Sequence, residues 1–287
     1  MLRNDAGMNA AFVDRSWLRG RLDDASIRIV DTRSTPHGAP GTALAAGSER
    51  YAAGHLPGAV HIDYATDLAD ASTPYAARVA PPEAFARTLA AHGIGDATAV
   101  VAYDDGDVPY AARFVWMCRY YGHDDVRVLA GGLAEWLASG EPMTREVPSY
   151  PPATFKPRVR PHLRASREDV LAVAQGRSDA QVLETQRDTT YALRDRDIAG
   201  AIRLSGSRLL EDRRGGRVAA PETLRRLVDE AGLDRAKRTI VSCGSGVSAA
   251  GAYLALLEAG FTDLAVYDGS WMEWKHDGLP TVAKQAP

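Results

Sequence analysis

The sequence has few cysteines, no long apolar run and little net charge, and each shortage argues against a class of structure or function. Only two of its 287 residues are cysteines, Cys118 and Cys243, which excludes a disulfide framework and predicts a reducing, cytoplasmic location. No apolar run approaches the ~18 residues that cross a bilayer, and no basic-then-apolar signal pattern opens the chain. A net charge of −3 gives no general attraction for nucleic acids or anionic membranes. The seven histidines show no ligand spacing with the cysteines, so no metal site is predicted.

What the chain does have is the composition of a globular protein, 45% hydrophobic and 25% charged, over a length that suits two domains. Short β-branched runs alternate with amphipathic segments. This pattern predicts an α/β fold in which mainly parallel sheets are flanked by helices. The predicted strands cover residues 27–30, 99–103, 126–129 and 239–242, and the predicted helices cover residues 82–92 and 111–121.

The second half of the chain repeats the first. The segment AVVAYDDGD aligns with TIVSCGSGV at an offset of 139 residues, which places Asp104 opposite Cys243. HLPGAVHI aligns with a degraded copy that begins at Asp197, and LAEW aligns with WMEW. Because several landmarks share nearly one offset, we predict two copies of one α/β domain.

A proline-rich segment separates the two copies. Residues 141–157 contain five prolines and no apolar periodicity, as expected of an extended linker. We predict an N-terminal domain over residues 1–145, a linker over 146–163 and a C-terminal domain over 164–287. Since the first copy has Asp104 where the second has a cysteine, only the C-terminal domain is predicted to be catalytic.

The stretch TIVSCGSGVS, residues 239–248, is the strongest functional signal. Cys243 ends a predicted strand, a glycine-broken loop follows, and an apolar helix begins at once. This geometry puts the thiol at the carboxyl edge of a parallel sheet, where loop amides and the positive end of the helix favour a thiolate. Cys243 is therefore predicted to be a nucleophile, whereas Cys118 lies in a helical apolar stretch and is predicted to pack in the core.

Three segments together are similar to the landmarks of the two-domain rhodanese-like sulfurtransferases, over nearly the whole chain: GHLPGAVHIDY, CGSGVS and YDGSWMEW. The loop CGSGVS resembles the C-G-S-G-V-T loop of the 3-mercaptopyruvate branch, with Ser248 in the threonine position. Thiosulfate sulfurtransferases usually carry basic residues there. A loop without cations also suits mercaptopyruvate, which has one carboxylate and a keto oxygen, better than the dianion thiosulfate.

The resemblance implies tandem rhodanese-like domains and a sulfurtransferase that needs no metal or organic cofactor. Cys243 would accept sulfur from 3-mercaptopyruvate, or alternatively from thiosulfate, as a persulfide. The sulfur would then pass to cyanide, a small thiol or a thioredoxin-like protein. The loop positions carried over as substrate-binding residues are Gly244, Gly246, Val247 and Ser248.

The resemblance also implies that Ser245 acts with a histidine of the first domain, and His55 in GHLPGA matches that histidine. Each residue has a structural alternative. Ser245 would merely form the loop, and His55 would stabilise its turn by bonding local backbone. The segment Asp268–Gly269–Ser270 is predicted to be a strand-to-helix turn that Ser270 caps, with no chemistry assigned.

The second copy departs from the family pattern before the cysteine. Family members usually have D-[AS]-R there, and the arginine holds the substrate carboxylate, whereas this chain has Gln186 at the arginine position. Arg187, Arg194 and Arg196 are the candidates for the missing substrate cation. The alternative is that these arginines form a solvated charge cluster with the neighbouring aspartates.

Two other classes of function compete with this interpretation. A cysteine phosphatase has a C-x5-R loop, but Ala249 stands six residues after Cys243 and the loop has no cation, which excludes that class. A non-catalytic persulfide carrier or scaffold is favoured by the altered stretch at residues 184–201 and disfavoured by the retained cysteine. No feature of the sequence supports a nucleic-acid or membrane partner.

Overall fold

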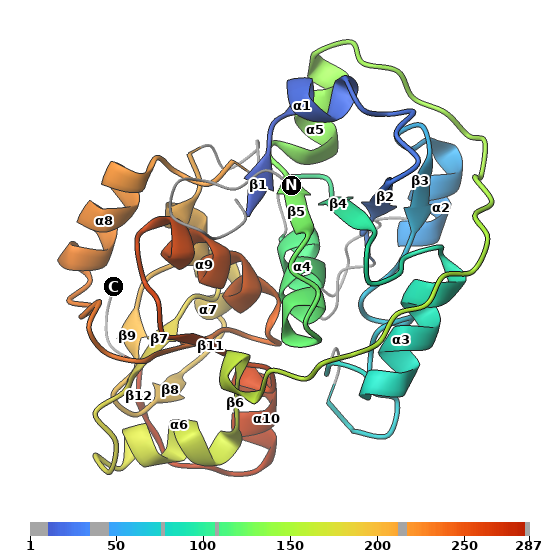
Figure 1. Cartoon of the computed structure of the whole chain (residues 1–287). Coiled ribbons are helices and arrows are strands. Elements are labelled where there is room, and N and C mark those ends of the chain that lie inside the picture. The colour runs from blue at the N-terminus through green and yellow to red at the C-terminus, as the bar shows by residue number, and fades with distance from the viewer. Residues whose placement is uncertain (1–10, 35–45, 76–77, 107–108, 212–216, 285–287) are drawn as a thin grey trace. The chain divides into compact units, whose positions relative to one another are not determined.

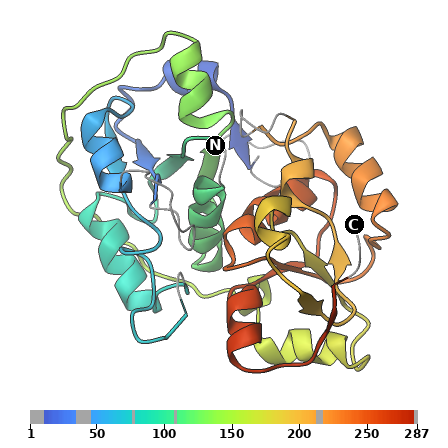
Figure 2. The ribbon, with the colours of Figure 1, turned by 180° about the vertical axis from the view of Figure 1, so that it is seen from behind.

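The computed structural model describes residues 11–34, 46–75, 78–106, 109–211 and 217–284 (Figure 1). The chain divides into two compact units. Unit 1 contains residues 1–159 and 214–217, and unit 2 contains residues 160–213 and 218–287. Each unit holds one five-stranded sheet in which every described pairing is parallel (Figures 1 and 2). The mainly parallel sheets that the sequence predicted are present in both halves.

Unit 1 has the strand order β1-β5-β4-β2-β3. Its strands are β1 (Phe12–Val13), β2 (Ile27–Asp31), β3 (Ala59–His61), β4 (Ala99–Tyr103) and β5 (Val126–Leu129). Its helices are α1 (Arg15–Arg19), α2 (Gly47–Ala53), α3 (Pro82–Ala91), α4 (Tyr110–Tyr120) and α5 (Gly132–Ala138). The strands β2, β4 and β5 are buried along almost their whole length because helices cover the sheet, as in other parallel sheets.

Unit 2 has the strand order β6-β11-β10-β7-β9 and a separate antiparallel pair, β8 with β12. The strands are β6 (Arg164–Ala165), β7 (Gln181–Glu184), β8 (Arg196–Ile198), β9 (Ile202–Arg203), β10 (Thr239–Ser242), β11 (Leu264–Tyr267) and β12 (Thr281–Ala283). The α-helices are α6 (Arg167–Ala174), α7 (Asp188–Tyr191), α8 (Pro221–Glu230), α9 (Val247–Glu258) and α10 (Ser270–His276). Two 3₁₀ turns are η1 (Pro161–Leu163) and η2 (Gly206–Leu209).

The central strand of unit 2 is β10, which lies between β11 and β7. Its last residue, Ser242, is in register with Glu184, the last residue of β7. Thr185 then bonds back to the carbonyl of Ser242 through its backbone N–H at 2.8 Å and its hydroxyl at 2.9 Å. Because parallel strands end at the same edge of the sheet, Cys243 and the residues after Glu184 meet there.

The two copies of the internal repeat share equivalent hydrogen bonds at equivalent positions. In unit 1 the N–H of Leu133 donates to the carbonyl of Asp104 at 2.8 Å, and in unit 2 the N–H of Trp271 donates to the carbonyl of Cys243 at 2.9 Å. The indole N–H groups of Trp136 and Trp274 each reach a proline carbonyl at 2.9 Å. Both indoles are fully buried in the core of their own unit.

The proline-rich segment lies along unit 1. Tyr150 donates its hydroxyl to the carbonyl of Gly58 at 2.8 Å, and the Arg28 guanidinium stacks on its ring at 3.2 Å. Further along, the N–H of Ala153 donates to a carbonyl of α3 at 3.0 Å. Neither helix nor strand forms between residues 145 and 160, all of which are described. Among the helices of the described residues, none is long and apolar enough to cross a membrane.

Candidate active site

Cys243 stands between the end of β10 and the start of α9. The backbone N–H of Gly246 donates to its sulfur at 3.1 Å. Gly246 has φ +82°, a left-handed conformation that favours glycine at the point where the loop turns into α9. The N-terminus of the twelve-residue helix α9 adds a positive dipole end. Cys243 is 2% exposed, so little water screens these interactions. The predicted strand–loop–helix geometry at the cysteine is present.

The loop after Cys243 is neutral and partly accessible. Gly244, Ser245 and Ser248 are half-buried, whereas Gly246 and Val247 are buried. The Ser245 hydroxyl makes no hydrogen bond with another described residue, so it remains available to a ligand. The predicted roles of these loop residues in binding and catalysis stay predictions.

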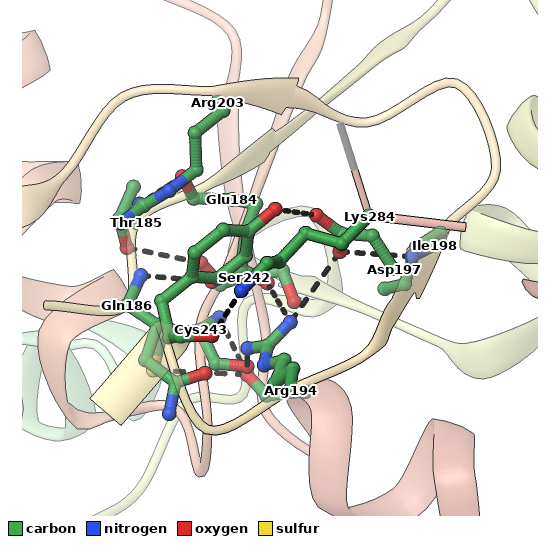
Figure 3. A network of polar contacts seen from close by, with 12 residues as sticks. Glu184, Thr185, Gln186, Arg194, Asp197, Ile198, Arg203, Ser242, Cys243 and Lys284 are labelled. Carbon is green, nitrogen blue, oxygen red and sulfur yellow. Dashed lines mark hydrogen bonds and ion pairs between the residues drawn. The ribbon is translucent and has the colours of Figure 1, made fainter. Parts of the chain in front are cut away.

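Arg194 is the centre of a buried polar network behind the loop, and Figure 3 shows its guanidinium among three acceptors. It donates to the carbonyl of Cys243 at 3.2 Å, to the carboxylate of Glu184 at 3.1 Å and to Asp197 at 3.3 Å. It also lies over the Trp271 ring, 4.6 Å from the centroid. Arg194 is 8% exposed, and its donors to the Cys243 carbonyl and to two carboxylates tie the loop to β7 and β8.

Glu184 is the buried anion that Arg194 neutralises. Its carboxylate is fully buried and also accepts the N–H of Gln186 at 2.8 Å. Burial raises the pKa of Glu184, and the nearby Arg194 opposes that rise. In unit 1 the equivalent acid is Asp31, which is neutralised by Arg33. The guanidinium of Arg33 donates to the two carboxylate oxygens of Asp31 at 3.0 and 2.6 Å. The buried acid is therefore paired with an arginine two residues later in unit 1, and with Arg194, ten residues later, in unit 2.

Gln186 occupies the position that Arg33 has in unit 1. Its side-chain amide lies against Gly244, because a Cβ added to that glycine would come within 3.3 Å of Nε2. Its Oε1 atom is buried without a hydrogen-bond partner among the described residues. The wall of the loop at this point is therefore polar and uncharged, and the carbonyl oxygen of Gln186 has spare hydrogen-bonding capacity.

The three candidate arginines have different surroundings. The guanidinium of Arg187 is half-buried and makes no hydrogen bond or ion pair with another described residue. Arg196 is exposed and donates to the carbonyl of Thr281 at 2.8 Å, which ties β8 to β12. Arg196 is thus exposed but bonds Thr281 and not the neighbouring aspartates of the solvated-cluster alternative, whereas Arg194 pairs with Asp197 in a buried network. Of the three, only Arg187 has no partner among the described residues, and their roles in substrate binding stay predictions.

His55 is buried within unit 1. One ring nitrogen lies 2.8 Å from the carbonyl of Tyr51 and the other lies 3.0 Å from the carbonyl of Glu146, while the ring stacks on Tyr51 at 3.8 Å. With a fully buried ring and a backbone carbonyl at each nitrogen, His55 has the turn-stabilising arrangement. These contacts are the ones that the turn-stabilising alternative predicts, and a catalytic role of His55 stays a prediction.

Ser270 was predicted to cap a helix, and this prediction is wrong. The N-cap of α10 is Gly269, and Ser270 is the first residue inside the helix. Its hydroxyl donates to the carbonyl of Tyr267 at 2.8 Å and accepts the N–H of Cys243 at 3.1 Å. A contact across 27 residues leaves no periodic signal in the sequence. The alignment of GSW with GGL in the first copy was the available clue.

Comparison with known proteins identifies relatives of both halves. The model of the Rhodanese-like domain matches residues 14–139 and 169–277. The chain is 30% identical to 3-mercaptopyruvate sulfurtransferase of Escherichia coli, covering 92% of this chain and 94% of that protein. It is 34% identical to thiosulfate sulfurtransferase of Bos taurus, covering 94% and 93%. It is also 30% identical to the sulfur carrier protein TtuD of Thermus thermophilus, covering 91% and 92%.

Solved structures agree with these relatives. The crystal structure of SseA from Escherichia coli, a 3-mercaptopyruvate sulfotransferase with the rhodanese fold, superposes with a TM-score of 0.82 at 30% identity. That match covers 92% of this chain and 99% of SseA. The structure of EanB with ergothioneine superposes with a TM-score of 0.81 at 21% identity, which shows a shared fold.

Proposed function

This chain belongs to the rhodanese-like sulfurtransferases, and from that membership we propose that Cys243 carries sulfur as a persulfide from 3-mercaptopyruvate to a thiol or cyanide acceptor. The tandem rhodanese-like fold predicted from sequence is confirmed, as is sulfurtransferase activity as its class of function. One observation supports Cys243 as the sulfur carrier: its sulfur accepts a hydrogen bond from the Gly246 N–H at 3.1 Å, at the start of α9.

In the first half-reaction the Cys243 thiolate attacks the sulfur of the donor. A sulfur–sulfur bond forms, the carbon–sulfur bond of 3-mercaptopyruvate breaks, and its electron pair leaves with the three-carbon fragment. Protonation of that enolate gives pyruvate, and a Cys243 persulfide remains. The Gly246 N–H and the dipole of α9 favour the negative charge on the Cys243 sulfur before the step, and the dipole also favours the charge on the outer sulfur of the persulfide after it.

In the second half-reaction an acceptor thiolate or cyanide attacks the outer sulfur of the persulfide. The sulfur–sulfur bond breaks, and its electron pair returns to Cys243 as a thiolate. The product is an acceptor persulfide or thiocyanate, so the enzyme ends as it began. Small thiols and thioredoxin-like proteins are the proposed biological acceptors, in a reducing cytoplasm where Cys243 stays a free thiol.

The domain boundaries form part of the proposal, with a non-catalytic domain over residues 1–145, a linker over 146–163 and a catalytic domain over 164–287. In the first copy Asp104 occupies the nucleophile position. Its carboxylate accepts the N–H groups of Gly106 and Ala111, each at 2.8 Å. Since a carboxylate takes the loop amides and is no sulfur nucleophile, unit 1 is proposed to support the fold without chemistry of its own.

The donor is proposed from charge. Thiosulfate is a dianion and requires compensating cations, whereas residues 244–248 supply none. The half-buried Arg187 follows directly after Gln186, which contacts the loop. One cation beside a neutral loop suits the single carboxylate of mercaptopyruvate, and thiosulfate is the alternative donor.

Replacing Arg187 with glutamine should weaken binding of the anionic donor. We expect the KM for 3-mercaptopyruvate to rise about tenfold with little change in kcat, because a charge-assisted contact is lost from substrate and transition state alike. The matched control is Arg196→Gln, which removes a cation that is already bonded to Thr281. Steady-state kinetics of both variants decide the point, and equal effects of the two changes would contradict a binding role for Arg187.

A persulfide carrier is the second candidate, and Gln186 is the observation that favours it, because a neutral amide stands where the family pattern and the first copy, with Arg33, have an arginine. Intact-protein mass spectrometry distinguishes the two functions. The protein is exposed briefly to 3-mercaptopyruvate or to thiosulfate and then chased with cyanide. Enzyme function requires a cyanide-labile gain of one sulfur, about 32 Da, on Cys243. If neither small donor loads Cys243 but a protein persulfide does, the carrier function is correct.

A further inference from the structure

Ser270 has an unfavourable backbone conformation. Its φ is +50°, and among the described residues it is the only one other than glycine with a positive φ. A side chain in the left-handed region crowds the following carbonyl, so this conformation costs conformational free energy. Such strain persists only where the surroundings maintain it, and it often marks a residue with a role.

Unit 1 shows how the same turn is built without strain. The position equivalent to Ser270 is Gly132, whose φ is +52°. A Cβ added there would lie 2.6 Å from the carbonyl oxygen of Asp104, the residue that replaces the cysteine. The non-catalytic copy thus has the residue that this φ favours, whereas the copy that contains Cys243 has a serine.

The hydrogen bonds of the Ser270 hydroxyl indicate the role of this side chain. It donates to the carbonyl of Tyr267 at 2.8 Å and accepts the backbone N–H of Cys243 at 3.1 Å, and its oxygen lies 4.0 Å from the cysteine sulfur. It therefore links the end of β11 to the nucleophile. Without it, the buried N–H of Cys243 would lose its partner.

We propose that Ser270 is a positioning residue that fixes the backbone of Cys243, so that the sulfur meets the Gly246 N–H. This rests on the proposed function of Cys243. The cysteine is then held from both ends, its N–H by Ser270 and its carbonyl by Trp271 at 2.9 Å and by Arg194 at 3.2 Å. The strained φ places the Ser270 oxygen within reach of that N–H, which a glycine cannot provide.

The test compares Ser270→Gly with Ser270→Ala. The glycine variant loses the hydroxyl and the strain together, so its thermal unfolding should stay near that of the wild type. The alanine variant keeps the strain and should unfold at a lower temperature. Both should load sulfur and react with iodoacetamide at Cys243 about three- to tenfold more slowly, the effect of one hydrogen bond. The pH midpoint of alkylation should also move upward, because a displaced sulfur accepts a weaker hydrogen bond from the Gly246 N–H, which then stabilises the thiolate less.

The matched control is Ser242→Ala, which removes a neighbouring buried hydroxyl that has no hydrogen-bond partner among the described residues. It should leave alkylation unchanged. A folded Ser270→Gly variant that alkylates at the wild-type rate with an unchanged midpoint would overturn the proposal, since a purely structural serine predicts that result. Alkylation requires no sulfur donor, so a failure of 3-mercaptopyruvate to load Cys243 would count against the proposed function and leave this test intact.

Discussion

Replacing Cys243 with serine should abolish sulfur transfer. A hydroxyl at this position has no sulfur to form the persulfide, and loss of a covalent nucleophile costs on the order of a thousandfold or more in kcat. The fold should survive, because the Gly246 N–H that faces the sulfur at 3.1 Å also bonds an oxygen. Transfer to cyanide measured as thiocyanate, together with the absence of the added sulfur mass, checks the expectation.

The control is Cys118→Ser. Cys118 is fully buried in α4, and burial raises the pKa of its thiol, so it stays protonated and unreactive. The substitution buries a hydroxyl in an apolar site and should lower stability slightly while leaving activity per folded molecule nearly intact. A comparable loss of transfer from both substitutions would contradict the assignment of Cys243 as the nucleophile.

The sequence predicted those parts of the molecule that arise from local pattern. The strand before Cys243, the glycine loop and α9 follow one another within twenty residues, so β-branched and apolar periodicity revealed all three. The repeat was visible because several aligned segments share nearly one offset, and the structure adds an equivalent contact in each copy, Trp136 with Pro142 and Trp274 with Pro280. The observed helices 82–91 and 110–120 differ from the predicted ones by a residue at their ends.

The sequence did not predict which polar groups are buried together. Arg194 and Cys243 are 49 residues apart, and their contact depends on β7 and β10 ending at the same edge of the sheet. Arg187, Arg194 and Arg196 are alike as residue types, but burial beside Glu184 engages only Arg194. His55 was assigned chemistry by its motif, whereas the carbonyls at both ring nitrogens become visible only in the fold. Such assignments depend on desolvation and long-range geometry.

Removing the Arg194 side chain should damage both stability and activity. In Arg194→Met the carboxylates of Glu184 and Asp197 lose the cation that lies within 3.3 Å of each. Loss of one partner from a buried ion pair costs about 3–5 kcal/mol of unfolding free energy. The carbonyl of Cys243 also loses a donor, so the loading of sulfur should slow in the fraction that remains folded. Denaturant unfolding and persulfide loading, measured on the same samples, check both effects.

The pH dependence of this variant identifies the cause of the loss. Without Arg194 the pKa of Glu184 rises further above its usual 4.5, because burial is no longer opposed. A carboxyl whose pKa is raised in the folded state contributes stability at low pH and loses it as the pH rises through the raised value. The stability deficit of Arg194→Met against the wild type should therefore be smallest below the usual pKa of 4.5 and should grow as the pH rises above it.

A second substitution separates the loss of charge neutralisation at Glu184 from the loss of the hydrogen bond to the Cys243 carbonyl. Glu184→Gln in the Arg194→Met background removes the stranded anion and should recover part of the stability at neutral pH. It should not recover the rate of sulfur loading, because the carbonyl of Cys243 still lacks its guanidinium donor. If the double variant regains both stability and rate, Arg194 serves only to neutralise Glu184, and the loop is held by Trp271 and Ser270 alone.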